Sequence, residues 1–255
     1  LGGFHPYSGS LLFSGVALAL VSAARRSPFF TVVDTATHTL MASEDNVTAA
    51  YLMPFLAIVA TQMVAGAVST GNSFEVLYPL RVVTAAVALV YFRRFYRDLR
   101  WTWSWEAVGV GVLVFGLWMA LEPSPDPAKQ AAFTASLHAL PPAMAVVWLI
   151  ARVVGSVVTV PIAEELAFRG YLGRRLVAAD FERVSFRTFT WLAFLGSSVL
   201  FGVMHGRWLA GSLAGMLYAL LLYRRGELGD AISAHAITNA MIAGYVLTTG
   251  SWLLW

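Results

Sequence analysis

The chain has 255 residues, of which 58% are hydrophobic and only 12% are charged, and its mean hydropathy is +0.70. This composition is far more apolar than that of an ordinary soluble domain, so it excludes a soluble globular protein. The formal net charge of +3 does not indicate nucleic-acid binding, because the basic residues are spread between apolar segments. The lack of cysteine excludes a catalytic thiol, a disulfide framework and a cysteine-based zinc site.

Eight apolar segments come close to the roughly 20 residues that a helix needs to cross a bilayer. They predict an all-α, polytopic transmembrane helical bundle of about eight spans, in which residues 1–255 form a single integral-membrane domain. The first four spans fall within residues 1–121. The segments are residues 10–24, 49–68, 74–92, 105–121, 140–163, 188–204, 208–223 and 231–250.

The basic residues predict how these spans are oriented. Twelve of the seventeen lysines and arginines follow odd-numbered spans, and the positive-inside rule places such loops in the cytoplasm. Both termini are then expected on the non-cytoplasmic side, together with the acidic, proline-rich segment 122–127. The twelve are Arg25, Arg26, Arg93, Arg94, Arg97, Arg100, Arg174, Arg175, Arg183, Arg187, Arg224 and Arg225.

The fifth span carries two adjacent glutamates and an arginine in otherwise apolar surroundings. An ionised side chain at bilayer depth costs several kcal/mol, so such groups usually face a bundle interior, pair with one another and mark a functional site. Glu165 and Arg169 are four residues apart, which predicts an ion pair on one helix face. Glu164 lies about 100° further round the helix, so its carboxylate stays free for chemistry.

Two other residues of the fifth span stand out. Pro161 has no backbone N–H and is expected to free the carbonyl of Val157, which admits a water or a side chain nearby. Arg152 lies more than two turns before the glutamates. Its side chain could extend to the interface, pair with an acid or line a cavity, and the sequence leaves these three alternatives open.

Two further apolar segments each carry polar residues one helical turn apart. Phe201 and His205 share one face, and His235 and Asn239 share another. Carboxylates, imidazoles and an amide together suggest hydrolysis, because a carboxylate can take a proton from water while an amide N–H stabilises an oxyanion. Neither a G-x-S-x-G nor an H-E-x-x-H motif occurs, so an activated water is the remaining nucleophile.

These three groups of residues resemble, in type and in order, the three motifs of the CPBP family. This family groups type II CAAX prenyl endopeptidases with bacteriocin-processing and Abi-type membrane proteins. The resemblance covers about residues 140–245 and implies an eight-helix bundle with a water-filled cavity that opens inside the membrane. The motif residues are Glu164, Glu165 and Arg169, then Phe201 and His205, then His235 and Asn239.

The resemblance also implies a role for each polar residue. Glu164 would be the general base that activates the attacking water, with His205 as its partner. His235 and Asn239 would stabilise the oxyanion, and the Glu–Arg ion pair of the first motif would support the site. The implied activity is that of a metal-independent glutamate intramembrane endopeptidase, a hydrolase that needs no cofactor.

The expected partners follow from the same resemblance. Eukaryotic members cut prenylated CAAX tails, whereas a prokaryotic member would process a membrane-anchored protein or peptide. We therefore expect a membrane-anchored substrate and the lipid bilayer as partners, no nucleic acid, and a location in a bacterial inner (plasma) membrane. Related domains also resemble the C-terminal part of fused exosortase proteins, and a start at Leu1 would suit a domain cut from such a longer chain.

Two other functions remain open from the residues alone. In one, Glu164, His205 and His235 bind zinc in a membrane metalloprotease, since carboxylate and imidazole are standard zinc ligands. In the other, the same buried polar network serves a non-enzymatic transporter or assembly scaffold. Inverted repeats of the kind found in many transporters are not apparent in the sequence, which counts against the second alternative.

One geometric condition must hold for the protease hypothesis. A strict eight-span topology places Glu164 near the cytoplasmic end of span five and His205 near the outer end of span six. The two can meet if span five continues as one long tilted helix to about Leu176. Gly211 and Gly215 form a small-xxx-small pair and predict close packing of the seventh span against a neighbour.

Overall fold

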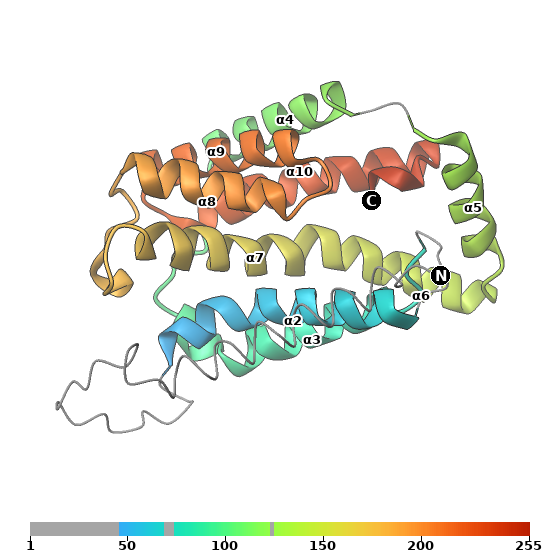
Figure 1. Ribbon diagram of the computed structural model, residues 1–255, viewed down its shortest axis with the longest axis horizontal. Coiled ribbons are helices and arrows are strands. Elements are labelled where there is room, and N and C mark those ends of the chain that lie inside the picture. The colour runs from blue at the N-terminus through green and yellow to red at the C-terminus, as the bar shows by residue number, and fades with distance from the viewer. Residues whose placement is uncertain (1–45, 69–73, 123–124) are drawn as a thin grey trace, which may run out of the picture.

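The computed structural model describes residues 46–68, 74–122 and 125–255, and every regular element within these ranges is helical (Figure 1). The all-α bundle that the composition predicted is confirmed. The predicted first span, residues 10–24, lies outside the described residues. The α-helices are α2 (Val47–Val68), α3 (Tyr78–Tyr91), α4 (Trp105–Ala120), α5 (Pro127–His138), α6 (Pro142–Val154), α7 (Val160–Glu165), α8 (Trp191–Val203), α9 (Trp208–Arg225) and α10 (Leu228–Thr249).

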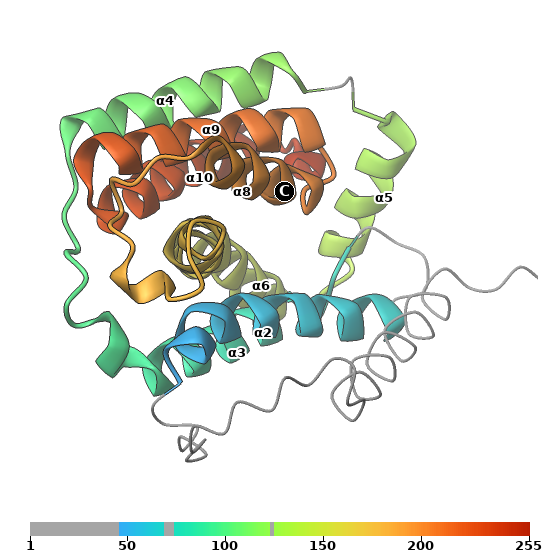
Figure 2. The ribbon, with the colours of Figure 1, turned by 60° about the vertical axis from the view of Figure 1, so that its left-hand side comes forward.

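A single long helix runs through the middle of the molecule. α6, η3 (Gly155–Thr159), α7 and η4 (Leu166–Gly173) join end to end into one helix, Pro142–Gly173, of 32 residues. The predicted continuation of the fifth span past the glutamates is therefore confirmed. Seen nearly end-on in Figure 2, the long helix lies between the α2–α3 pair and a group formed by α4, α8, α9 and α10.

Two stretches of the long helix, η3 and η4, have the wider π turn with i→i−5 hydrogen bonds. Short π stretches inside α-helices are rare and occur often at functional sites. Here they flank α7, whose last two residues are the paired glutamates. The local winding therefore changes on both sides of the residues that the motif analysis singled out.

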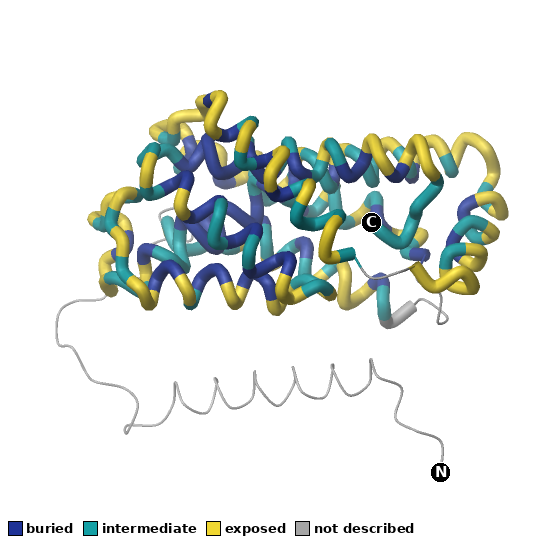
Figure 3. The backbone as a smooth tube through the Cα atoms, turned by 90° about the horizontal axis from the view of Figure 1, so that it is seen from above, coloured by how far each residue is buried: buried dark blue, intermediate teal, exposed yellow. Residues whose placement is uncertain are grey.

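Several helices suit a bilayer in length and composition. Among the described residues, α2, the long helix and α10 are long and apolar enough to cross a membrane, and α3, α4 and α8 are shorter apolar helices. Large apolar side chains cover the outside, such as Val87 on α3 (62% exposed) and Leu192 on α8 (64% exposed). Figure 3 shows this pattern along the backbone, with buried residues where helices meet. Such an outer surface is stable in lipid and unfavourable in water.

The arginine-rich segments meet at one end of the bundle. α3, the long helix and α9 end where α4, α8 and α10 begin (Figure 1). Ion pairs join these segments: Arg225 lies 3.7 Å from Glu106, and Arg100 lies 3.2 Å from Glu227. The charge pattern thus describes one face of the bundle, and the side of the membrane on which that face lies stays a prediction.

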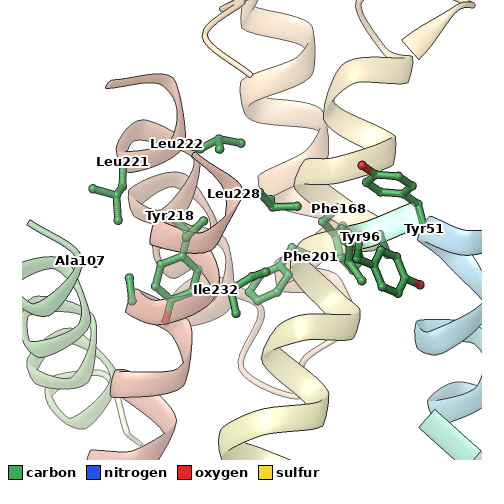
Figure 4. Close-up of a cluster of buried hydrophobic side chains, with 14 of the residues drawn as sticks. Tyr51, Tyr96, Ala107, Phe168, Phe201, Tyr218, Leu221, Leu222, Leu228 and Ile232 are labelled. Atoms are coloured by element: carbon green, nitrogen blue, oxygen red, sulfur yellow. The ribbon is translucent and has the colours of Figure 1, made fainter. Parts of the chain in front are cut away.

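Close packing of α8 on α9 depends on glycine, as the small-xxx-small pair predicted. A Cβ on Gly211 would lie 2.9 Å from the Cα of Gly202, and a Cβ on Gly215 would lie 3.1 Å from the carbonyl oxygen of Ser198. Aromatic side chains fill the space between this pair of helices and the long helix. Figure 4 shows Phe168, Phe201 and Tyr218 gathered there, within the largest buried apolar cluster.

Two local features differ from the sequence interpretation. α3 begins at Tyr78 rather than at residue 74, because Pro79 occupies its first turn, where a missing N–H costs nothing. α5 was not predicted at all. It begins after Asp126, whose carboxylate accepts hydrogen bonds from the backbone N–H groups of Ala128 and Lys129 and so caps the helix.

Candidate active site

The paired glutamates lie at the end of α7 and are both removed from solvent. Glu165 is completely buried, and its Oε2 lies 3.2 Å from the Nε of Arg169, one turn further along the helix. The ion pair that the spacing predicted is therefore present. Arg169 also donates from Nη2 to the carbonyl of Gly215 at 2.8 Å, which ties the long helix to α9. Its guanidinium lies 4.4 Å from the ring centroid of Phe201, a further favourable contact for the buried charge, while Nη1 has no hydrogen-bond partner among the described residues.

His235 of α10 joins the same network from the other side. Its Nδ1 lies 3.0 Å from Oε1 of Glu165, so this carboxylate holds Arg169 with one oxygen and His235 with the other. The ring of Tyr218 stacks on His235 with centroids 5.0 Å apart. The Tyr218 hydroxyl donates to Thr238 at 2.9 Å, which fixes the stacked ring. His235 is thereby held in one orientation with Nε2 pointing away from Glu165.

His205 follows the end of α8 and is more accessible than His235 or either glutamate, with 24% of its side chain exposed. Its Nδ1 lies 2.7 Å from the carbonyl of Phe201, to which only a protonated Nδ1 can donate. In the neutral ring Nε2 then carries the lone pair. Nε2 lies 3.7 Å from Oε2 of Glu164. This separation exceeds a direct hydrogen bond, and a water to one side of the pair would reach both groups.

Glu164 is the point on which the two histidines converge. Its Oε2 lies 3.7 Å from Nε2 of His205 and 4.0 Å from Nε2 of His235. The same oxygen is buried and has no hydrogen-bond partner among the described residues. A carboxylate oxygen that is buried without a partner is costly and rare in a folded protein, so it marks a place where a proton, a water or a substrate group is handled.

Asn239 is held by the backbone of the long helix. Its Nδ2 donates to the carbonyl of Ser156 at 2.8 Å. In the π stretch the N–H of Val160 bonds to the carbonyl of Gly155, five residues back, so the carbonyl of Ser156 would need the N–H of residue 161. That residue is Pro161, which has none. The expectation that proline frees the carbonyl of Val157 was therefore off by one residue, because the wider turn shifts the gap to Ser156.

A cavity of about 230 Å³ opens beside these groups. His205, His235 and Asn239 line it, whereas Glu164 is not among its lining residues and lies next to both imidazoles. Arg152 also lines the cavity, which decides among the three alternatives that the sequence left open.

A comparison of the sequence with known protein families finds a match over the region that contains these residues. A family model described as "Type II CAAX prenyl endopeptidase Rce1-like" matches residues 146–241. This region belongs to the CPBP family. The matched region begins in α6, ends in α10 and contains all the motif residues, so it confirms the resemblance that the motifs carried. At the level of the family, the match supports a CAAX-type intramembrane protease, and together with the apolar helices it supports an integral membrane protein.

The match leaves the N-terminal helices α2, α3 and α4 and the helix α5 outside the CPBP region. No curated protein and no solved structure matches the chain. The geometry around Glu164 therefore rests on the structure alone. Within the described ranges, no group of three or more His, Cys, Asp or Glu side chains is arranged to hold a metal ion. The zinc alternative is tested by the effect of a chelator on cleavage.

Some residues of the site were missed from the sequence. Tyr218 and Thr238 hold His235 in place, and Trp118 lies with its ring centroid 6.1 Å from that of His205. The sequence carried only a weak signal for these residues. Thr238 directly precedes Asn239, and Tyr218 stands three residues after Gly215 on the same helix face. A tyrosine among leucines and glycines in a span reads as packing unless its partner is known.

Proposed function

We propose that the chain is an intramembrane endopeptidase that hydrolyses a peptide bond of a membrane-anchored protein or peptide with a water activated by Glu164 and His205. The observation that carries the proposal is the buried, unpartnered Oε2 of Glu164, within 4.0 Å of Nε2 on each of two histidines. The CPBP family match supports the reaction class.

The geometry suggests how the proton moves. A water between Glu164 and His205 gives its proton to the carboxylate, with the lone pair on Nε2 of His205 accepting its second hydrogen bond. The resulting hydroxide attacks the scissile carbonyl carbon. When the tetrahedral intermediate collapses, the C–N bond breaks and the proton held by Glu164 passes to the leaving nitrogen. The products are a carboxylic acid and an amine, and Glu164 is regenerated as a carboxylate.

Two groups facing the cavity can stabilise the oxyanion. Asn239 uses one of its two amide hydrogens on Ser156, which leaves the other for the substrate. His235 presents Nε2 at the same cavity, and it donates from there when it carries a second proton, because its Nδ1–H is used by Glu165. Glu165 and Arg169 touch no cavity atom in this arrangement, and we assign them the positioning of His235.

The experiment is cleavage of a single-span peptide by purified protein in proteoliposomes. We expect a defined cut in wild type and none in Glu164→Gln, which serves as the control for contaminating proteases. Cleavage should continue unchanged with a strong chelator, whereas loss that zinc restores would support the metalloprotease alternative. If folded wild-type protein cuts no member of a panel of membrane-anchored peptides, the transporter or scaffold alternative is favoured and the proposal fails.

The proposed location is a bacterial inner membrane, with the arginine-rich end of the bundle in the cytoplasm and both termini outside. The gathering of Arg100, Arg187, Arg224 and Arg225 at one end supports a single cytoplasmic face. Labelling of single cysteines introduced at that end tests the orientation, since the chain has none of its own.

A further inference from the structure

A second arginine of the long helix has no carboxylate partner among the described residues. Arg152 forms no ion pair within the part of the chain that the structure describes, and its Nε is buried without a hydrogen-bond partner. Its guanidinium lies 4.2 Å from the ring centroid of Tyr78 and 5.7 Å from that of Trp255. The guanidinium also shares a side-chain hydrogen bond with Tyr78. Arginine has five N–H donors, so others remain for a ligand.

The charges around Arg152 do not cancel. Arg81 and Arg152 both line the cavity, and among the described residues the only acid that forms an ion pair with either of them is Glu75. Glu75 is bound to Arg81 at 2.5 Å. Among the described residues, this end of the cavity therefore keeps one positive charge that no carboxylate offsets, and an unpaired charge inside a membrane costs several kcal/mol. A negative group in the cavity would remove that cost.

The same cavity connects this charge to the proposed reaction centre. Arg152 lies one turn before Ser156, whose carbonyl holds Asn239, and the cavity continues from there to His205 and His235. Arg152 precedes Glu164 by 12 residues, which is about 18 Å along an ideal helix. An extended peptide covers roughly 3.3–3.6 Å per residue, so about five residues span this distance.

We propose that Arg152 determines substrate specificity by binding a carboxylate of the substrate within about five residues of the scissile bond. The guanidinium donates two parallel hydrogen bonds to the two carboxylate oxygens, a geometry for which arginine is better suited than lysine. The carboxylate comes either from the C-terminus of the substrate or from an acidic side chain. This inference rests on the proposed function, because it presupposes that the occupant of the cavity is the substrate.

The test uses two pairs of membrane-anchored peptides in proteoliposomes of neutral lipid. One pair differs only in a free or an amidated C-terminus, and the other, amidated throughout, carries Asp or Asn within five residues of the cut. We expect wild type to cleave at least one acidic peptide with a kcat/KM about ten to a hundred times that of its neutral counterpart, the range for a hydrogen bond to a charged group. The pair that shows the preference identifies the source of the carboxylate.

Variants then assign the preference to Arg152. Arg152→Gln should lower kcat/KM for the acidic peptide to that of its neutral counterpart. Arg152→Lys should keep part of the preference, because lysine retains the positive charge but cannot donate two parallel hydrogen bonds. Equal cleavage of both members of each pair by wild type overturns the inference while the proposed function stands, as does a preference that survives in Arg152→Gln. If wild type cuts none of the four peptides, the proposed function itself fails.

Discussion

Arg169 and Arg152 belong to the same long helix, yet their surroundings are opposite. Arg169 has a carboxylate, a backbone carbonyl and an aromatic ring around it, and all three are parts of the protein. Arg152 has two aromatic rings and a cavity. A buried arginine whose charge is compensated internally supports the fold, whereas one that is left uncompensated beside a cavity is available to a ligand. The residue type alone does not distinguish the two.

The largest expected difference between the two arginines is in stability. Arg169→Ala should lower the free energy of unfolding by about 3–5 kcal/mol, because it leaves Glu165 buried without its cation. Arg152→Ala should cost less, about 1–2 kcal/mol for its two cation–π contacts, because no buried carboxylate loses its partner. Thermal unfolding in detergent measures both. Equal destabilisation by the two substitutions would contradict the comparison.

The next largest effect is expected at Asn239, because its amide both binds the carbonyl of Ser156 and faces the cavity. Asn239→Ala should lower kcat by about 10²–10³, the usual loss for an oxyanion donor. It should also reduce stability by about 1–3 kcal/mol, because the carbonyl of Ser156 is left without a donor. Ser156→Ala is the matched control, since Asn239 contacts the backbone and not the hydroxyl. If Asn239→Ala keeps full activity, the amide has no part in catalysis.

The smallest effect concerns the glycine beside Arg169. Gly215→Ala would place a methyl group 3.0 Å from Nη2 of Arg169 and 3.1 Å from the carbonyl oxygen of Ser198, and we expect a loss of about 1–3 kcal/mol from overpacking. Gly244→Ala is the control, because a Cβ there meets nothing within 4 Å. It should be neutral or gain up to about 1 kcal/mol in helix propensity. Chemical denaturation of both variants decides, and a stable Gly215→Ala would mean that α9 can move away from Arg169.

The sequence predicted the parts of the site that depend on one helix. The spacing of Glu165 and Arg169 predicted their ion pair, and the need for Glu164 to reach His205 predicted the continuation of the long helix. These arguments need only the period of a helix and the cost of a charge in lipid. They also separated the two adjacent glutamates before any neighbour was known.

The parts that were not predicted depend on contacts between helices or on irregular winding. Whether Arg152 had an acid beside it could not be known without the position of Arg81 and Glu75 on α3 and before it. The π turn that leaves the carbonyl of Ser156 open has no sequence signature beyond Pro161. Stacking of Tyr218 on His235 likewise joins two helices whose register the sequence does not specify. Helical periodicity describes one element at a time.

The most direct test of the proposed division between the two glutamates compares Glu164→Gln with Glu165→Gln, in cleavage rate and in unfolding temperature. Glu164→Gln should unfold like wild type, because Oε2 of Glu164 has no partner to lose, and its cleavage should fall at least about a hundredfold. Glu165→Gln should instead unfold at a clearly lower temperature, because Arg169 loses its counter-charge. Full cleavage by folded Glu164→Gln would contradict the assignment of Glu164 as the base.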